Sequence, residues 1–352
     1  MKSRIGIRLA IIILMIMTSA VGVVFFLGWM AVKPLSMKNG FIRSFIDVEL
    51  NPAKSVARPV DVVSIAGASN SELYFETKDP NRIYVIDDGL KSGKYINLNI
   101  FRDGKKFSQF RCTVDSPNVY IYSGNYRTII NAPFSDSMRV HSFPTVLFTK
   151  AAFISDQKVV FRIFDGLRQI FALGNLYTGE VIKEKGISST ANDLGIASDG
   201  MLKYDKLTKK IVYVHSYTNK VVVMDSNLNL IKSMHTVDTI TAADILTGKI
   251  GSNGIITNVG AKRLINAKCT VRNGVLFINS RIIADNEHKN DFRSSSIIDM
   301  YNIRSGSYLG SFHIPLPSKK LKDIQAVDDG IVILSSDKII IYKLSFIKNL
   351  VI

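Results

Sequence analysis

Short apolar runs separated by turn-forming residues dominate the chain beyond its first fifty residues. The clearest example is residues 200–236, where Ile211–His215, Val221–Asp225 and Leu230–Met234 are each apolar or alternate between apolar and polar positions. Strands of this length, joined by tight turns rich in Asn and Asp, are typical of β-propeller blades. The stretch therefore predicts three consecutive antiparallel strands of one blade.

Pairs of such runs recur along the chain, which makes the predicted fold class all-β. Six pairs stand out: Glu72–Phe75 with Ile83–Asp87, Val119–Tyr122 with Thr128–Asn131, Val159–Phe164 with Gln169–Leu173, Ile211–His215 with Val221–Asp225, Val275–Asn279 with Ile297–Tyr301, and Ile331–Leu334 with Ile339–Leu344. Further short strands are predicted at Gly179–Lys183, Leu230–Met234 and Ser307–His313. Because each propeller blade buries its faces only against its neighbours, this repetition predicts a β-propeller. Six blades are favoured, and seven remain open.

The last predicted blade has too few strands. An open ring would leave unpaired strand edges, so another segment must close it. Phe45–Leu50 alternates like a half-buried strand. We expect this segment to complete the last blade from the N-terminal side.

Polar segments interrupt the strand pattern in the second half of the chain. Thr239–Thr247 has some helical character, residues 251–260 form a loop containing Gly and Asn, and Ala284–Arg293 is a polar insertion. Loops that project from a rigid scaffold commonly carry function. The last two segments are therefore the candidate binding loops. Their candidate residues are Asn253, Asn258, Asp285, Glu287, His288 and Asp291.

The N-terminus has a different pattern, with no charged residue between Leu9 and Val32. A helix over this run would be roughly 36 Å long, enough to cross a hydrocarbon layer of about 30 Å. Lys2, Arg4 and Arg8 precede it, and the positive-inside rule places them in the cytoplasm. We expect a retained signal anchor, so that the lipid bilayer is a partner of this helix. Cleavage after Ala20, as in a signal peptide, is the alternative.

These patterns divide the chain into four segments. Residues 1–8 are the cytoplasmic N-terminus, 9–32 the transmembrane signal anchor, 33–51 a connector with the candidate closing strand, and 52–352 the propeller. The two cysteines, Cys112 and Cys269, could form a disulfide if this domain lies outside the cytoplasm. Buried free thiols are the alternative, since Cys is a common small core residue.

The formal net charge of +16 suggests affinity for anions. Basic residues cluster at Arg102–Lys106, at Lys203–Lys210 and around Lys320. Convergence of these clusters on one face would attract anionic polymers or lipids. The chain carries no nucleic-acid-binding motif, so no nucleic-acid partner is expected.

No pattern of catalytic or metal-binding residues stands out. The five histidines are spaced unlike zinc ligands, and the chain contains neither a G-x-S-x-G elbow nor a Gly-rich phosphate loop. Asp225–Asn229 resembles the start of a calcium loop but has Leu230 where a glycine is needed and Thr236 where the closing glutamate is needed. It is better interpreted as a hairpin turn. No cofactor is expected.

Several segments are similar to those of a known group of proteins. They are Val63–Phe75, Asp199–Tyr204, Val212–Val214, Val223–Leu230, Val275–Ser280, Ser296–Tyr301 and Ser311–Pro315. Together they resemble single-pass, propeller-like proteins of Bacteroidota that are related in shape to the TolB-like six-bladed propellers. The resemblance implies a Gram-negative origin and, with the anchor, an inner-membrane protein whose C-terminal domain faces the periplasm. It implies no catalytic residues.

The function predicted from these observations is a non-catalytic binding or scaffolding module with a protein or glycan partner in the periplasm. The alternative is an enzyme with its site in the central funnel, such as a lyase, a hydrolase or a quinone-dependent dehydrogenase. Propellers host such chemistry with residues drawn from several blades, which one sequence does not reveal. Carboxylates, histidines and arginines gathered around the axis would favour the enzyme. An apolar or evenly basic face would favour binding.

Overall fold

The computed structural model describes residues 12–26, 38–46, 52–69, 71–98, 100, 109–134, 137–189, 191–245, 247–250, 255–258, 260, 263–316 and 321–344. The chain divides into two compact units, Met1–Asn39 and Gly40–Ile352. In the first unit, residues 12–26 form a helix. No helix in the described ranges combines the length and apolar character needed to span a membrane.

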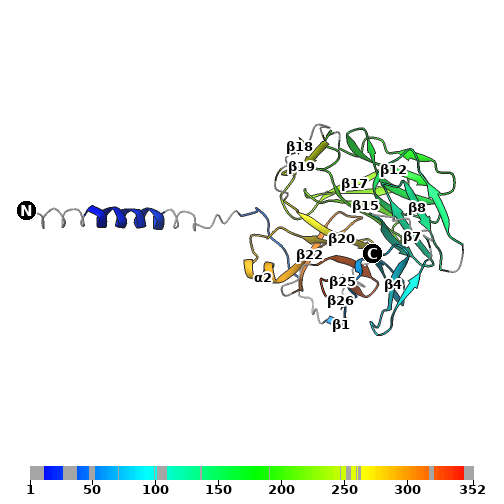
Figure 1. The fold of residues 1–352 in the computed structure, drawn as a ribbon, viewed down its shortest axis with the longest axis horizontal. Helices are drawn as coiled ribbons and strands as arrows, with labels where there is room; N and C mark the ends of the chain where they lie inside the picture. The colour runs from blue at the N-terminus through cyan, green and yellow to red at the C-terminus, as the bar shows by residue number, and fades with distance from the viewer. Residues whose placement is uncertain are drawn as a thin grey trace, which may run out of the picture. The chain divides into compact units, whose positions relative to one another are not determined.

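The second unit is a six-bladed β-propeller (Figure 1). Each blade is an antiparallel sheet of four strands, and the six innermost strands follow one another around the central axis. This arrangement confirms the predicted all-β propeller, and the number of blades is six rather than seven.

The first three blades follow the chain directly. Blade 1 comprises β2 (Val62–Ala68), β3 (Glu72–Thr77), β4 (Arg82–Asp87) and β5 (Gly93–Asn97). Blade 2 comprises β6 (Arg111–Asp115), β7 (Asn118–Ser123), β8 (Thr128–Asn131) and β9 (Arg139–Ser142). Blade 3 comprises β10 (Phe148–Phe153), β11 (Lys158–Asp165), β12 (Arg168–Asn175) and β13 (Val181–Lys183).

The remaining blades include one insertion and the closing strand. Blade 4 comprises β14 (Gly200–Asp205), β15 (Lys210–His215), β16 (Lys220–Asp225) and β17 (Leu230–His235). A two-stranded hairpin, β18 (Thr247–Ile250) and β19 (Ile255–Asn258), precedes blade 5. Blade 5 comprises β20 (Asn266–Arg272), β21 (Val275–Ser280), β22 (Ser295–Asn302) and β23 (Tyr308–Pro315), with helix α2 (Lys289–Ser294) before β22. Blade 6 comprises β24 (Asp323–Val327), β25 (Gly330–Leu334), β26 (Lys338–Lys343) and β1 (Pro52–Ala57).

The six strand pairs predicted from the sequence are the two middle strands of the six blades. Middle strands are covered by neighbouring blades on both faces, so they are apolar over most of their length. In β15 and β16, for example, the four central residues are all buried. In outer strands such as β17, buried and exposed residues alternate only weakly, because one face of the strand contacts solvent. Burial therefore explains why the middle strands carry the clearest sequence pattern.

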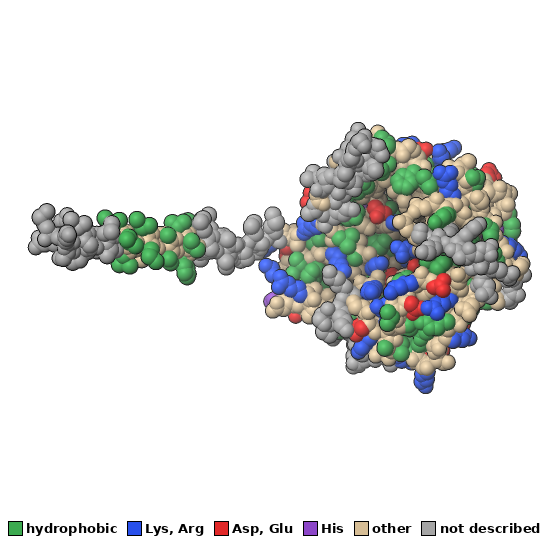
Figure 2. Space-filling view, viewed as in Figure 1, with side chains coloured by type: hydrophobic (Ala, Val, Ile, Leu, Met, Phe, Trp, Pro, Cys, Tyr) green, Lys and Arg blue, Asp and Glu red, His purple; other side chains and the backbone are tan. Residues whose placement is uncertain are grey.

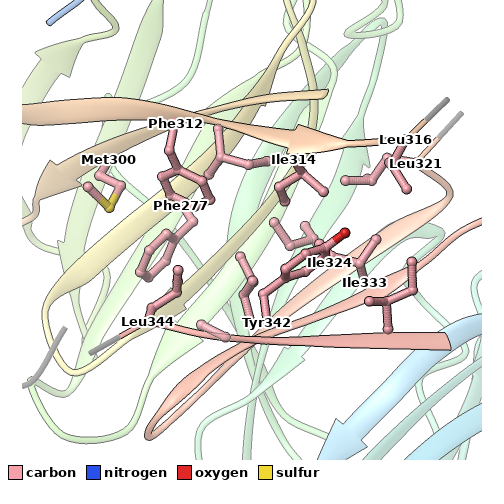
Figure 3. Close-up of a cluster of buried hydrophobic side chains, with 14 of the residues drawn as sticks. Phe277, Met300, Phe312, Ile314, Leu316, Leu321, Ile324, Ile333, Tyr342 and Leu344 are labelled. Carbon is pink, nitrogen blue, oxygen red and sulfur yellow. The ribbon is translucent and has the colours of Figure 1, made fainter. Parts of the chain in front are cut away.

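Six of the hydrophobic clusters in the core lie one between each pair of neighbouring blades, and a small seventh cluster contains Phe41, Ile265, Ile282 and Ala284. Figure 3 shows the cluster between blades 5 and 6, where Phe277 and Phe312 of blade 5 lie with Ile333 and Tyr342 of blade 6. A corresponding cluster joins blade 6 to blade 1 and includes Leu334 and Phe75. The clusters thus form a closed circle, and no blade buries its faces alone.

The ring is closed by β1, which pairs with β26 as the outermost strand of blade 6. Closure by an N-terminal strand agrees with the prediction, but the proposed segment, Phe45–Leu50, was wrong. Phe45 instead forms a single parallel bridge with Ser311 on blade 5, and residues 47–50 lie outside the described residues. The sequence of Phe45–Leu50 alternates and that of Pro52–Ala57 does not, yet it is Val56 of β1 that packs against the cluster joining blades 6 and 1.

The predicted helical character of Thr239–Thr247 is also wrong for its described residues. Residues 239–245 are irregular. The Asp238 carboxylate accepts the backbone N–H of Ile240, and Asn219 donates its N–H to the Ile240 carbonyl. These bonds hold the segment as a loop, because they use backbone groups that a helix would pair internally. The helix that does form, α2, lies in the polar insertion predicted as a loop.

The segment Asp225–Asn229 is a hairpin turn, as predicted. One carboxylate oxygen of Asp225 accepts the N–H groups of Asn227 and Asn229, each at 2.8 Å. Leu228 adopts a left-handed backbone conformation with φ 63°. This geometry is typical of an Asx turn and leaves the carboxylate occupied by the chain's own backbone.

If β1 closes the ring through its apolar contact, Val56→Asp should reduce the free energy of unfolding by about 2 kcal/mol, because it places a charge against the cluster between blades 6 and 1. The matched control is Ala57→Asp, at an exposed position of the same strand, which should change stability by less than about 0.5 kcal/mol. Urea unfolding followed by circular dichroism measures both. Equal losses would contradict closure through Val56.

Candidate functional site

A cavity of about 570 Å³ lies at the centre of the ring and is lined by the innermost strands of all six blades. One residue from each strand illustrates the lining: Ile65, Thr113, Ala152, Lys203, Thr270 and Gln325. The strands contribute unequally, from four residues of β2 to one residue of β24. On the visible face, basic and acidic side chains mingle around the middle of the propeller (Figure 2).

Ion pairs connect the hairpins that border this cavity. Lys206 on the hairpin after β14 pairs with Asp115 at the end of β6, which joins blade 4 to blade 2. Arg272 at the end of β20 pairs with Asp328 of blade 6 at 2.7 Å. Two of the cations in the lining therefore already have a carboxylate partner.

Asp205 also lines the cavity, but its carboxylate is occupied. It accepts the Thr208 hydroxyl at 2.6 Å and the backbone N–H groups of Asn273 at 3.1 Å and Gly274 at 2.8 Å. Its side chain is buried, with only 3% of the residue exposed. Asp205 thus holds the hairpins of blades 4 and 5 together, which is a structural use of its charge.

Lys203 is the remaining cation of the lining and is partly buried. Its ammonium forms no ion pair with any residue that the structure describes. It lies close enough to Cys269 to influence the thiol: burial raises the pKa of Cys269 to about 12, and the charge of Lys203 opposes this shift. The lining holds three cations, Lys203, Lys206 and Arg272, and two carboxylates, Asp115 and Asp205. Because Asp328 pairs with Arg272, three carboxylates balance the three cations, and Lys203 is the cation of the lining without an ion-pair partner among the described residues.

Hydroxyl and amide groups complete the polar part of the cavity. Thr113, Thr270 and Gln325 come from β6, β20 and β24. The Thr270 hydroxyl accepts the backbone N–H of Ala326 at 3.1 Å, which ties blade 5 to blade 6. Such neutral groups can orient a polar ligand without adding charge.

None of the five histidines is among the lining residues of this cavity. His215, on β15, is the most strongly perturbed: burial lowers its pKa to about 3, and the charges of Lys220 and Arg162 act in the same direction. Within the described residues, no group of three His, Cys, Asp or Glu side chains is arranged to hold a metal ion.

The two cysteines do not form the disulfide considered from the sequence, since both are free and buried. Cys112 lies in the cluster between blades 1 and 2, whereas Cys269 lies in the cluster between blades 4 and 5. Burial raises the pKa of both thiols. They act as small core residues because neighbouring blades, rather than each other, surround them.

The polar insertion of blade 5 does not form an open binding loop over its central part. Its Glu287 pairs with Arg43 of the connector, and both side chains are buried. Asp285 accepts the backbone N–H of Gly40 at 3.1 Å, and Asn286 brackets the backbone of Arg43 with bonds of 3.0 and 2.8 Å. The insertion therefore binds a segment of its own chain.

Arg43 is the centre of this contact. Its guanidinium donates to Asp299 at 2.7 and 3.2 Å, to the Ser280 hydroxyl at 2.7 Å and to the Ile282 carbonyl at 2.9 Å, in addition to Glu287. Burial lowers the pKa of Arg43, but Asp299 and Glu287 raise it, and the net direction is upward. The connector is thus fastened to blade 5 by a buried, charged network.

The other candidate residues lie apart from the central cavity. His288 precedes α2 as its N-cap without a side-chain capping bond, and Asp291 accepts bonds from the hydroxyls of Ser294 and Ser295 through its backbone carbonyl. Asn258 is the last residue of β19, and Asn253 lies outside the described residues. Of the basic clusters, Lys203–Lys210 reaches the cavity through Lys203 and Lys206. Residues 102–106 and Lys320 lie outside the described residues.

Arg43 and Asp299 could not be found from the sequence, because 256 positions separate them. Arg43→Met should reduce the free energy of unfolding by about 3–5 kcal/mol, since it leaves two buried carboxylates without their cation. Arg43→Lys should lose less, because the charge remains although the bidentate contact with Asp299 does not. Arg304→Met, at an exposed position, is the control. Urea unfolding measures the free energy of unfolding of each variant. If Arg43→Met lost no more stability than Arg304→Met, Arg43 would not be the cation that holds the connector to blade 5.

Comparison with solved structures supports the fold. A crystal structure of a DUF4221 family member from Bacteroides vulgatus has a TM-score of 0.55 and 15% identity, covering 84% of this chain and 97% of that chain. A catalytically inactive virginiamycin B lyase from Staphylococcus aureus, solved with quinupristin, has a TM-score of 0.49 and 12% identity, covering 83% and 99%. No family model and no curated protein matches the chain. At 15% identity, the first of these similarities shows a shared fold and nothing beyond the fold.

Proposed function

We propose that this protein is a non-catalytic binding module and that its central cavity takes a small anionic ligand. The observation that carries the proposal is Lys203, a cation in the cavity lining without an ion-pair partner among the described residues. A partly buried ammonium gains most from an anion that reaches it, because the surrounding protein screens the interaction less than water does.

The state of the carboxylates supports binding rather than acid–base catalysis. Asp115 is paired with Lys206, and Asp205 accepts three hydrogen bonds from neighbouring hairpins. General acid–base catalysis needs a group that is free to exchange a proton with the substrate. In this cavity the carboxylates are used to join blades.

We further propose that the N-terminal helix is part of a membrane anchor over residues 9–32 and that the propeller faces the periplasm. Every side chain in the helix at 12–26 is exposed, including Phe25 at 78%. Exposed apolar side chains along a helix are best stabilised by lipid. The segments quoted in the sequence analysis support a place among the membrane-anchored, TolB-like propeller proteins of Bacteroidota.

Titration calorimetry on the full-length protein in detergent tests the cavity, with inorganic phosphate and citrate as probes. We expect at least one anion to bind, and Lys203→Gln to weaken that binding about tenfold, as for loss of one hydrogen bond to a charged group. Lys78→Gln, which removes an exposed lysine that is not among the lining residues, should leave the affinity unchanged. Absence of binding by both anions, or equal weakening by the two variants, would overturn the proposal.

Extraction of membranes tests the anchor. The full-length chain should remain in the pellet after washing with alkaline carbonate, because the apolar run is held by the hydrocarbon layer. A chain that lacks residues 1–37 should be recovered in the soluble fraction. Protease added to spheroplasts should digest the propeller of the full-length protein. Release of the full-length chain by carbonate, or protection of the propeller, would contradict this part of the proposal.

A further inference from the structure

Residues 40–46 of the connector lie against the outer edge of blade 5. Phe45 forms its parallel bridge with Ser311 of β23, the outermost strand of the blade, and the backbone N–H of Ile46 donates to the Ser311 carbonyl at 2.9 Å. The N–H of Ser311 donates in turn to the Ser44 carbonyl at 2.9 Å. Peptides that bind to the edge of a sheet use main-chain bonds of this kind. The segment therefore has the contacts of a bound peptide.

The side chains of this segment divide into an inward set and an outward set. Phe41 and Arg43 are 7% and 3% exposed, whereas Ile42 between them is 67% exposed. This alternation is that of an extended chain, in which every second side chain points to the same side. Phe41 enters the small cluster that includes Ile282, and Ile46 packs against the cluster between blades 5 and 6. Blade 5 therefore contacts the segment through an apolar, a cationic and a second apolar side chain.

The carboxylates that receive Arg43 are positioned by blade 5 itself. The Asp299 carboxylate accepts the hydroxyl of Ser311, and one carboxylate oxygen of Glu287 accepts the backbone N–H of Ala284 at 2.6 Å. Neither bond involves the connector. Because a site that is held in place before binding pays less to order its own groups, these bonds prepare blade 5 for a guanidinium.

Gly310 of β23 leaves the space that the segment occupies. Its φ is +132°, and a Cβ atom there would lie 2.6 Å from Cγ1 of Ile46. Glycine alone combines this backbone conformation with so close an approach. Residues 280–287 and β23 thus form a groove fitted to residues 40–46, the connector groove.

The contact in the connector groove is separable from the fold of the ring. Blade 6 is completed by β1, which begins after the segment, so all six four-stranded sheets are formed without residues 40–46. Burial of an ion pair costs the hydration of both charges, which offsets much of their attraction. One buried oxygen of Glu287 also has no hydrogen bond to any residue that the structure describes. Release of the segment would return these charges to water.

We propose that the connector groove is a peptide-recognition site and that residues 40–46 are its exchangeable ligand. The groove recognises an extended segment in which an arginine stands two residues after an aromatic residue, as Arg43 follows Phe41. Arginine sets the specificity because its guanidinium reaches Asp299 and Glu287 together. The contact acts as a latch, since its release lengthens the free segment between the helix at 12–26 and β1.

The test cuts the folded full-length protein, in detergent, at a site for a sequence-specific protease inserted between Ile46 and Pro52. With the N-terminal fragment immobilised through a tag, the propeller should stay bound until a free peptide of residues 40–46 displaces it overnight. The peptide with Arg43→Met should need at least tenfold higher concentration for the same release, because it leaves two carboxylates without a cation. The peptide with Ile42→Ser, changed at the exposed position, should match the parent peptide.

A variant of the groove provides a second measurement. In the cut protein without competitor, Glu287→Gln should speed the spontaneous loss of the propeller at least tenfold, because it removes one of the two charges that hold Arg43. Glu180→Gln, at an exposed position between β12 and β13, is the matched control and should leave the rate unchanged.

Four results would overturn the proposal. They are immediate loss of the propeller on cutting, no release by the parent peptide, equal release by the parent and Arg43→Met peptides, and equal rates for Glu287→Gln and Glu180→Gln. None of these measurements depends on membrane insertion or on anion binding in the central cavity, so the outcome is independent of the function proposed above.

Discussion

The structure depends on the burial of every blade against two neighbours. A four-stranded sheet with two apolar faces is stable only when other elements cover both faces. All six inter-blade clusters therefore form only if the ring of blades is complete. Pairing of β1 with β26 supplies that completion by joining the two ends of the propeller sequence in one sheet. Closure therefore turns a series of local hairpins into one cooperative domain, in which the first and last strands depend on each other.

The connector adds a second long-range constraint to this ring. Arg43 inserts between Asp299 and Glu287, and Phe45 stacks on His313 with centroids 4.6 Å apart. A buried charge of this kind costs desolvation and is tolerated because five hydrogen bonds satisfy it. The Arg43 contact fixes the position at which the segment before β1 leaves the propeller. An insertion that resembles a binding loop in the sequence thus serves as the receptor for the connector.

Ring geometry also creates the central cavity. The six innermost strands leave space around the axis, and residues from all six blades line it. Most charged groups of this lining are used to join blades, and Lys203 is the cation without an ion-pair partner among the described residues. This ammonium group is the reason that an anion is the ligand proposed for the cavity.

The sequence by itself determined the all-β class and the middle strands of every blade, because residues buried on both faces produce long apolar runs. It also determined the hairpin turn at Asp225, where side chain and backbone lie within five residues. Tertiary structure alone decided the closing strand, since Pro52–Ala57 lacks the alternation that Phe45–Leu50 shows and is recognised only by its pairing with β26 and the contact of Val56 with the cluster between blades 6 and 1. It likewise decided the Arg43–Asp299 pair and the cavity linings, which take single residues from strands far apart in the chain. Residues that make such contacts show no periodic pattern in the sequence, and only the folding of the closed ring brings them together.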